Sequence, residues 1–496
     1  MLSNLPSSSL VRQVPRFWTD FIPGRGKLAL PHCKERHLPQ ILPIRLTYAE
    51  RFRCIGSACE DTCCQGWSVP VDQAAYEKFL QLPASPLRSL IEASILTAPQ
   101  GAVDGKAFKP ASFAQIRMNG QNRCPLLTEE SLCRVQAELG EGFLTRTCAT
   151  YPRIANSIGG IEETALTLSC PEAARLVLLD PKLLAPVRLA QKGLAAAGQA
   201  RYAPAEAAAG DGLPSLLPWF RPIRQVVLAL AGNRAYPLWQ RLFLLGVFCR
   251  RLDAIASGEL QRSIPDFLGD FEATVASRAL LTAMETLPQE CAAQLDVVLR
   301  LAGMLLHRSN VRPRFVECVQ AFTAGIGNSP SATLESLAAH YAQAHDRYFE
   351  PFLRRHPHVL ENYLANTILR CRFPFGREGA QAGAPLSMTR ECALLTAQFA
   401  LVRGLLIGVA GFHGEAFSAA HVVHTVQAAS KHFEHHPEFS RLAYELLVES
   451  RMDGARGLAI LLRNAEPDAA SRAARPALPE MHAPGPREGR EVTTSF

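Results

Sequence analysis

The sequence lacks the features of an exported or membrane-embedded chain. Its first residues, MLSNLPSSSLVRQVPRF, carry prolines and polar side chains where a signal peptide needs a charged start and an unbroken apolar run. One stretch, residues 392–412, is long enough to span a membrane, but Gln398 and Arg403 interrupt it. We therefore expect a buried helix at 392–412, no membrane insertion and a cytoplasmic location.

Concentrated charge is also missing from the sequence. The net charge of +7 comes from Lys and Arg residues spread along the whole chain, without a dense basic block or a basic stripe interleaved with aromatic residues. This distribution predicts an ordinary solvated surface and no nucleic-acid partner.

Alternating strand patterns are scarce, whereas helix-period patterns are frequent. Runs such as YPLWQRLFLLGVFCRRLDAI place apolar residues at steps of three and four, and this pattern recurs to about residue 463. We expect a mainly α fold in which a cysteine-rich, metal-binding N-terminal domain precedes a multi-helical domain. The predicted division is a poorly ordered arm at 1–45, the cysteine-rich domain at 46–180, a linker-like excursion at 181–222, the helical domain at 223–463 and a disordered tail at 464–496.

Cysteine is plentiful, and its distribution is uneven. Fourteen cysteines in a chain without export features indicate a reducing compartment, where thiols stay free or bind metal. Eight of them are concentrated in the predicted N-terminal domain and are the candidate metal ligands: Cys54, Cys59, Cys63, Cys64, Cys124, Cys133, Cys148 and Cys170. The other six occur singly among apolar residues, which is typical of buried structural cysteines. About four of the eight are expected to be ligands.

The spacing of the first four cysteines, in CIGSACEDTCCQGW at 54–67, fits no standard site. A zinc ribbon has two separate C-x2-C knuckles, whereas the gaps here are four, three and zero residues. A plant-type ferredoxin would need a cysteine at Thr62, and a radical S-adenosylmethionine enzyme would need one at Gly66. Because Cys63 and Cys64 are adjacent, their thiolates cannot both reach one small ion freely. A larger, non-standard iron–sulfur cluster is therefore favoured, with zinc as the alternative.

The downstream cysteines lie in contexts that suit a metal-binding loop. These contexts are CPLL at 124–127, SLCRVQAELGEGFL at 131–144, CATYPR at 148–153 and LSCPEAARL at 168–176. In the first and last of them a proline follows the cysteine and stiffens the chain beside it. Four such cysteines after a tight four-cysteine loop favour metal binding over four unrelated buried thiols.

Taken together, these motifs resemble the flagellin lysine-N-methylase (FliB) family, within a wider group named for cysteine-rich zinc- or iron-chelating domains. The resemblance continues through ENYLANTILRCRFPFG at 361–376 to about residue 450. It implies methyl transfer from S-adenosylmethionine to lysine side chains of flagellin, in the cytoplasm, by an enzyme that carries a [4Fe-4S] cluster. The competing hypothesis is a metal-chelating interaction protein, binding zinc or iron, without catalytic activity.

The implied reaction requires a neutral lysine amine, although the unperturbed pKa of lysine is about 10.4. The site must therefore desolvate the ammonium or take its proton, and it must hold the nitrogen in line with the methyl group. Each side chain near the cysteine motifs that could do this work has a surface or structural role as its alternative. These weak catalytic candidates are Glu60, Asp61, Tyr151, Glu163 and Glu172.

The glycine-rich strand–turn–helix of Rossmann-type methyltransferases is not found in the sequence. The nearest glycine cluster, GVAGFHG at 408–414, follows a helix-like run and is interpreted as helix packing or a helix end. Two roles for the cluster stay open. Either three cysteines hold it and S-adenosylmethionine ligates the open iron, or four cysteines hold it and it is structural.

Overall fold

The computed structural model describes residues 46–65, 69–97, 113–130, 132–158, 161–187, 216–307, 311–376, 387–436 and 438–464. The predicted N-terminal arm, most of the predicted linker-like excursion and all but the first residue of the predicted tail lie outside these ranges.

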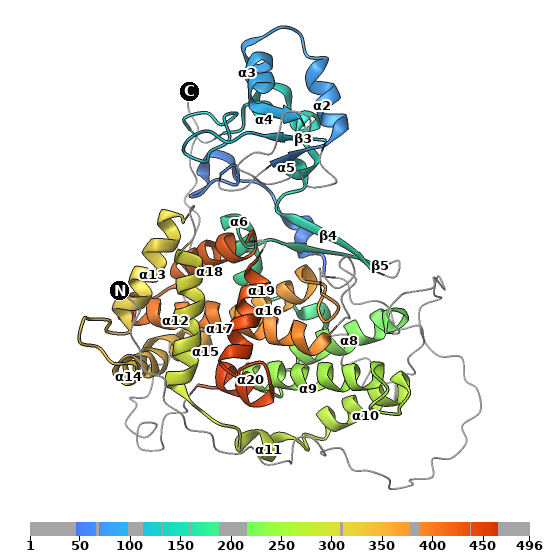
Figure 1. Cartoon of the computed structure of the whole chain (residues 1–496), viewed down its shortest axis with the longest axis vertical. Coiled ribbons are helices and arrows are strands. Elements are labelled where there is room, and N and C mark those ends of the chain that lie inside the picture. The colour runs from blue at the N-terminus through green and yellow to red at the C-terminus, as the bar shows by residue number, and fades with distance from the viewer. Residues whose placement is uncertain are drawn as a thin grey trace, which may run out of the picture. The chain divides into compact units, whose positions relative to one another are not determined.

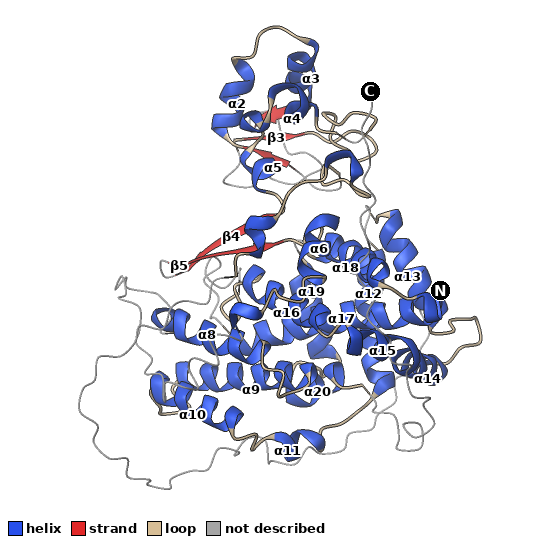
Figure 2. Ribbon diagram, turned by 180° about the vertical axis from the view of Figure 1, so that it is seen from behind, coloured by secondary structure: helices blue, strands red, loops and turns tan. Residues whose placement is uncertain are grey.

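Helices dominate the described residues, which confirms the expected mainly α fold (Figures 1 and 2). The helices before residue 180 are short: α2 (Gln73–Leu80), α3 (Pro86–Ser94), α4 (Arg134–Leu139), α5 (Arg146–Thr150) and α6 (Pro171–Leu178). The later helices are α8 (Phe220–Ala231), α9 (Leu238–Ala256), α10 (Ile264–Ala276), α11 (Leu281–Glu285), α12 (Cys291–Leu306), α13 (Pro313–Gly325), α14 (Leu334–Ala344), α15 (Glu350–Arg355), α16 (His358–Arg370), α17 (Met388–His413), α18 (Ala419–Phe433), α19 (Phe439–Glu449) and α20 (Ala455–Leu462). Tighter turns are η1 (Tyr48–Arg51), η2 (Gly56–Ala58), η4 (Glu141–Phe143), η5 (Leu217–Trp219) and η7 (Gly414–Ala416), and η6 (His345–Phe349) is a π-helical turn.

The strands are short and all precede residue 167 among the described residues (Figure 2). Strands β1 (Val69–Val71), β2 (Ile95–Thr97) and β3 (Ala114–Ile116) form an antiparallel sheet in the order β1-β3-β2, with Val69 and Ile95 both opposite Ile116. Strands β4 (Arg153–Ile158) and β5 (Ile161–Leu166) form a separate antiparallel hairpin, with Arg153 opposite Leu166.

Helix α17 is the long apolar segment in which the sequence predicted a buried helix. By length and composition it could cross a membrane, but its apolar window is wholly buried inside the fold. The predicted buried helix is therefore confirmed. At its crossing with α13 the backbones approach so closely that a Cβ on Gly325 would overlap the Gly408 carbonyl oxygen. The chain then leaves α17 at Gly414, whose φ is 54°. Both observations agree with the helix-packing interpretation of residues 408–414.

Two hydrophobic cores organise the described residues. The smaller one gathers β1, β2, β3, α2 and α3 with the segments around Cys124 and Val135. The larger one combines the helices after residue 216 with η1, β5 and α6. Side chains join these distant segments: the Tyr48 hydroxyl donates to Asn366 Oδ1 at 2.6 Å, and the Asn366 amide bonds both backbone groups of Leu166. The larger core thus contains residues from both sides of the linker-like excursion, and the division into domains stays a prediction.

Candidate functional site

The thiols of the cysteine motifs fall into neighbouring groups. Cys63 and Cys64 bring their sulfur atoms to 3.6 Å, and the backbone N–H of Cys124 donates to the Cys64 carbonyl at 2.8 Å. The charge of Cys63 also acts on the thiols of Cys124, Cys133 and Cys148.

A second set of thiols interacts through Cys170. Cys170 interacts electrostatically with both Cys59 and Cys63, and Cys59 interacts with Cys54. Electrostatic interactions between pairs of thiols thus link all eight cysteines that the sequence selected, from Cys54 to Cys170.

Most of these thiols are held in their protonated form by burial. Burial raises the pKa of Cys124 to about 11 and those of Cys148 and Cys170 to about 12. Cys63 differs: its hydrogen bond with Cys64, together with the charge of Lys431, lowers the pKa of Cys63 to about 7 despite burial. A bound cation would instead lower the pKa of the buried thiols, because a thiol that coordinates a metal is deprotonated.

Within the described residues, no three His, Cys, Asp or Glu side chains converge closely enough to hold a single metal ion. Five thiols nevertheless interact around Cys63 and Cys64. Cysteine sulfur is the donor that iron–sulfur clusters use, and a cluster is larger than a single ion. These thiols are donors of the kind that a polynuclear thiolate-bound group uses.

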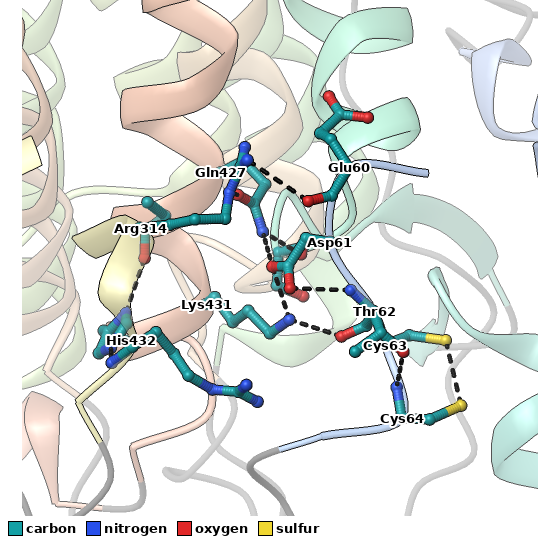
Figure 3. A network of polar contacts seen from close by, with 12 residues as sticks. Glu60, Asp61, Thr62, Cys63, Cys64, Arg314, Gln427, Lys431 and His432 are labelled. Atoms are coloured by element: carbon teal, nitrogen blue, oxygen red, sulfur yellow. Dashed lines mark hydrogen bonds and ion pairs between the residues drawn. The ribbon is translucent and has the colours of Figure 1, made fainter. Parts of the chain in front are cut away.

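The segment from Cys54 to Cys64, here called the cysteine loop, is anchored to helix α18 by a buried ion pair between Asp61 and Lys431 (Figure 3). The ammonium of Lys431 lies 2.7 Å from Asp61 Oδ2 and donates to the Thr62 carbonyl at 2.6 Å. The two side chains are only 9% and 13% exposed. Asp61 also accepts from Gln427 Nε2 at 2.8 Å and from the Thr62 backbone N–H at 2.8 Å. Three donors thus hold a single carboxylate two residues before Cys63.

The electrostatics of this pair are set by burial and by the opposite charge. Burial would raise the pKa of Asp61, but the charge and hydrogen bond of Lys431 outweigh it and hold that pKa below its usual value. For Lys431 the balance is different: burial lowers its pKa, and the attraction of Asp61 offsets this only in part. Burial beside the cysteine loop therefore lowers the pKa of a lysine even when a carboxylate is paired with it.

The pair is extended by residues from α13 and from the loop before α6. Gln427 donates to the Ser169 carbonyl at 2.9 Å and accepts from Arg314 Nε at 3.2 Å (Figure 3). His432 Nε2 accepts the backbone N–H of Arg312 at 3.1 Å, and its ring stacks on Phe315. Helix α18 therefore connects the start of α13, the cysteine loop and the segment that carries Cys170.

A second polar network surrounds the Ser169 hydroxyl, one residue before Cys170. This hydroxyl lies 3.0 Å from the Tyr151 hydroxyl, 2.8 Å from Thr167 Oγ1 and 2.8 Å from His435 Nε2. Thr167 in turn donates to Glu434. Burial raises the pKa of Tyr151 well above its usual value, so this phenol stays protonated at neutral pH.

The structure places the five catalytic candidates in four settings. Asp61 belongs to the network of Lys431 and Gln427, and Tyr151 belongs to the network around the Ser169 hydroxyl. Glu60 and Glu172 share the guanidinium of Arg175 near the surface. Glu163, on β5, forms a buried ion pair with Arg224 of α8 at 2.8 Å. Each of the four carboxylates is thus already paired with a cation.

Sequence reasoning missed Lys431, Gln427 and Arg312. The first two come from a helix more than 360 residues after the cysteine loop. A signal was nevertheless present, because Gln427 and Lys431 are four residues apart and lie on one face of a helix that is otherwise largely apolar there. A polar stripe on a buried helix face indicates partners that the local sequence does not contain.

The fold and the site together define a mainly helical protein whose thiols gather beside a buried lysine–aspartate pair. The family model described as the FliB lysine N-methylase C-terminal domain matches residues 224–461. The chain is 31% identical over 139 residues to the lysine-N-methylase of Salmonella typhimurium and 30% identical over 139 residues to the flagellar biosynthetic protein FliU of Salmonella muenchen. These matches cover 28% of this chain, 33% of the first relative and 78% of the second.

The chain therefore belongs to the FliB lysine N-methylase family. The match spans only about a third of the length of the Salmonella lysine-N-methylases. No solved structure matches the chain.

Proposed function

We propose that this protein is a protein-lysine N-methyltransferase that moves methyl groups from S-adenosylmethionine to lysine side chains of flagellin in the cytoplasm. The observation that carries the proposal is membership of the FliB family, two of whose Salmonella members are named lysine-N-methylases. The name of a third relative, a flagellar biosynthetic protein, supports flagellin as the partner.

The surroundings of the cysteine loop support the chemistry that this reaction requires. A substrate lysine must lose its proton before its nitrogen can attack the methyl group. Burial already lowers the pKa of Lys431 beside this loop, and a substrate lysine entering similar surroundings would experience the same desolvation. The carboxylates of Glu60, Asp61, Glu163 and Glu172 are already paired with cations, so none of them is free to face an incoming ammonium. Desolvation is therefore our proposed route to the neutral amine.

The proposed cofactor is a [4Fe-4S] cluster held by four of the five thiols around Cys63: Cys63, Cys64, Cys124, Cys133 and Cys148. When bound, such a cluster would supply either a rigid thiolate-bound centre or an iron position open to a ligand. The chain's own contribution is to hold the cysteine loop in place through Asp61, Lys431 and Gln427, and to place a positive charge beside Cys63.

Methyl transfer is tested by incubating the anaerobically purified protein with flagellin and labelled S-adenosylmethionine. We expect label on flagellin, and mass spectrometry of its peptides should locate the label on lysine side chains. Flagellin incubated without the protein is the control. A protein that binds flagellin but transfers no label would support the chelating interaction protein instead.

The cluster is tested by measuring iron, acid-labile sulfide and zinc per chain. About four irons and four sulfides are expected for a [4Fe-4S] cluster. Of the single serine variants at the five cysteines around Cys63, four should lose most of the iron, whereas Cys291→Ser should keep it, because Cys291 lies on α12 outside the cysteine motifs and its thiol contacts the Ala338 carbonyl. About one zinc per chain without sulfide would show that the cysteines hold zinc in place of the proposed cluster.

A further inference from the structure

The guanidinium of Arg312 has a buried donor without an acceptor among the described residues. This residue immediately precedes helix α13 and is half-buried, and its Nη2 has no access to solvent and no hydrogen-bond partner in the described part of the chain. A buried donor without an acceptor costs free energy, and the cost is larger when the donor is charged. Such a group is a sign that an anion belongs beside it.

The neighbouring acid is already occupied. Asp61, which acts electrostatically on Arg312, is bonded by Lys431, Gln427 and the Thr62 backbone. Lys431 and Arg312 therefore stand beside one shared carboxylate, and the charge of Arg312 has no carboxylate of its own among the described residues.

Two further features make this position suitable for an anion. Arg312 is the residue before the first turn of α13, so the positive end of the helix dipole adds to its charge. Its backbone N–H is fixed by His432, whose ring is in turn held against Phe315. The guanidinium therefore projects from an anchored backbone. The planar guanidinium group matches the two oxygens of a carboxylate.

We infer that Arg312, with the charge of Lys431 beside it, binds the carboxylate of the amino-acid part of the methyl donor. This inference rests on the proposed function, because that function requires S-adenosylmethionine, which carries one carboxylate, at this site. The Arg312 contact accounts for the unused charge, and it places the donor's amino-acid part next to the cysteine loop.

The test is calorimetric binding of two non-reactive ligands to the anaerobically purified full chain. S-adenosylhomocysteine has the carboxylate, and 5′-methylthioadenosine lacks the amino-acid part. Arg312→Gln should weaken S-adenosylhomocysteine binding by roughly ten- to a hundredfold, the range for a lost hydrogen bond to a charged group. Binding of 5′-methylthioadenosine should stay unchanged. The affinity of Arg312→Lys for S-adenosylhomocysteine should lie between those of Arg312→Gln and the unaltered protein. The matched control is Arg300→Gln, which removes an exposed arginine paired with Glu449 on α19.

Each of the other outcomes overturns the inference. If Arg312→Gln binds S-adenosylhomocysteine as tightly as the unaltered protein, the carboxylate is bound elsewhere. If Arg312→Gln instead loses only flagellin binding, the carboxylate belongs to an acidic side chain of the protein substrate. If both ligands weaken equally, or if iron content falls, Arg312 supports the fold or the cluster. If the unaltered protein binds neither ligand, the proposed methyltransferase function fails together with the inference.

Discussion

At the residue scale, the buried pair of Lys431 and Asp61 is where a single substitution should be felt most. Lys431→Met would leave the Asp61 carboxylate buried without its cation, and breaking a buried pair costs about 3–5 kcal/mol. We expect the free energy of unfolding in urea to fall by about that amount. Exposed Lys182→Met is the control and should have no measurable effect. A Lys431→Met protein as stable as the unaltered one would show that the pair does not anchor the loop.

Tyr151 gives a second prediction at the residue scale. Tyr151→Phe removes the hydroxyl that contacts Ser169 and should reduce stability by about 0.5–1.5 kcal/mol, the net value of a typical hydrogen bond. Tyr341→Phe is the matched control, because the buried Tyr341 hydroxyl has no partner among the described residues, and we expect no loss. Since the raised pKa keeps Tyr151 protonated, the pH profile of methyl transfer should have the same shape in Tyr151→Phe. A changed profile would make Tyr151 a proton acceptor.

At the element scale, the crossing of α13 and α17 depends on glycine. A Cβ at Gly325 would meet backbone atoms of α17, which cannot yield as a flexible side chain does. Gly325→Ala should therefore destabilise the fold by about 1–3 kcal/mol, the usual cost of overpacking. Gly303→Ala on α12 is the matched control, because nothing lies within 4 Å of its Cβ, and it should stabilise by up to about 1 kcal/mol. Equal effects at the two positions would contradict the close crossing.

The contact between α16 and α9 predicts a pH dependence. Glu361 on α16 is bonded by Arg241 of α9 at 2.8 Å and by Arg234 at 2.6 Å. Burial would raise the pKa of Glu361, but the two arginines outweigh it and the pKa is lowered below its usual 4.5. A carboxyl whose pKa is lowered in the folded state stabilises the protein above its unfolded pKa. This contribution to stability is lost as the pH falls through the pKa of the carboxyl in the folded state.

Glu361→Gln should accordingly cost about 3–5 kcal/mol at neutral pH, because it breaks a buried pair. The difference in unfolding free energy between Glu361→Gln and the unaltered protein should be largest at pH 6 to 7. It should shrink below about pH 4.5, where the unfolded carboxyl is already neutral. Exposed Glu335→Gln provides the control. A difference that does not vary with pH would mean that the shape of the carboxylate, rather than its charge, is what the arginines require.

At the scale of the whole molecule, the larger core is shared between distant parts of the sequence. Residues from η1, β5 and α6 are buried in the same core as α16 and α18. A fragment of residues 216–464 lacks these segments and should expose the faces they cover. We expect it to unfold without a cooperative transition and to bind a hydrophobic dye, whereas residues 46–464 should unfold cooperatively. Cooperative unfolding of the shorter fragment would support the predicted domain boundary.

Much of the fold was predictable because its signals are local. The three- and four-residue spacing of apolar side chains predicted the helices, and the long apolar run at 392–412 predicted a buried helix, since Gln398 and Arg403 argued against a membrane. The short strands β1, β2 and β3 were not foreseen, because three residues are too few to show alternation. The same limit applies to the site. The grouping of eight cysteines between residues 54 and 170 was visible in the sequence, but the contacts of Asp61 with Gln427 and Lys431 were not.

The sequence by itself determined a mainly helical chain, the eight thiols between residues 54 and 170 and a resemblance to a methylase family. Only the tertiary structure decided that Asp61 meets Lys431, that Ser169 meets His435 and that Arg312 is left with an unused charge beside them. The physical reason is distance along the chain. Periodicity and loop composition act over a few residues, whereas these pairs join loops near the cysteines to residues of α18 and its C-terminal end, hundreds of residues further along the chain.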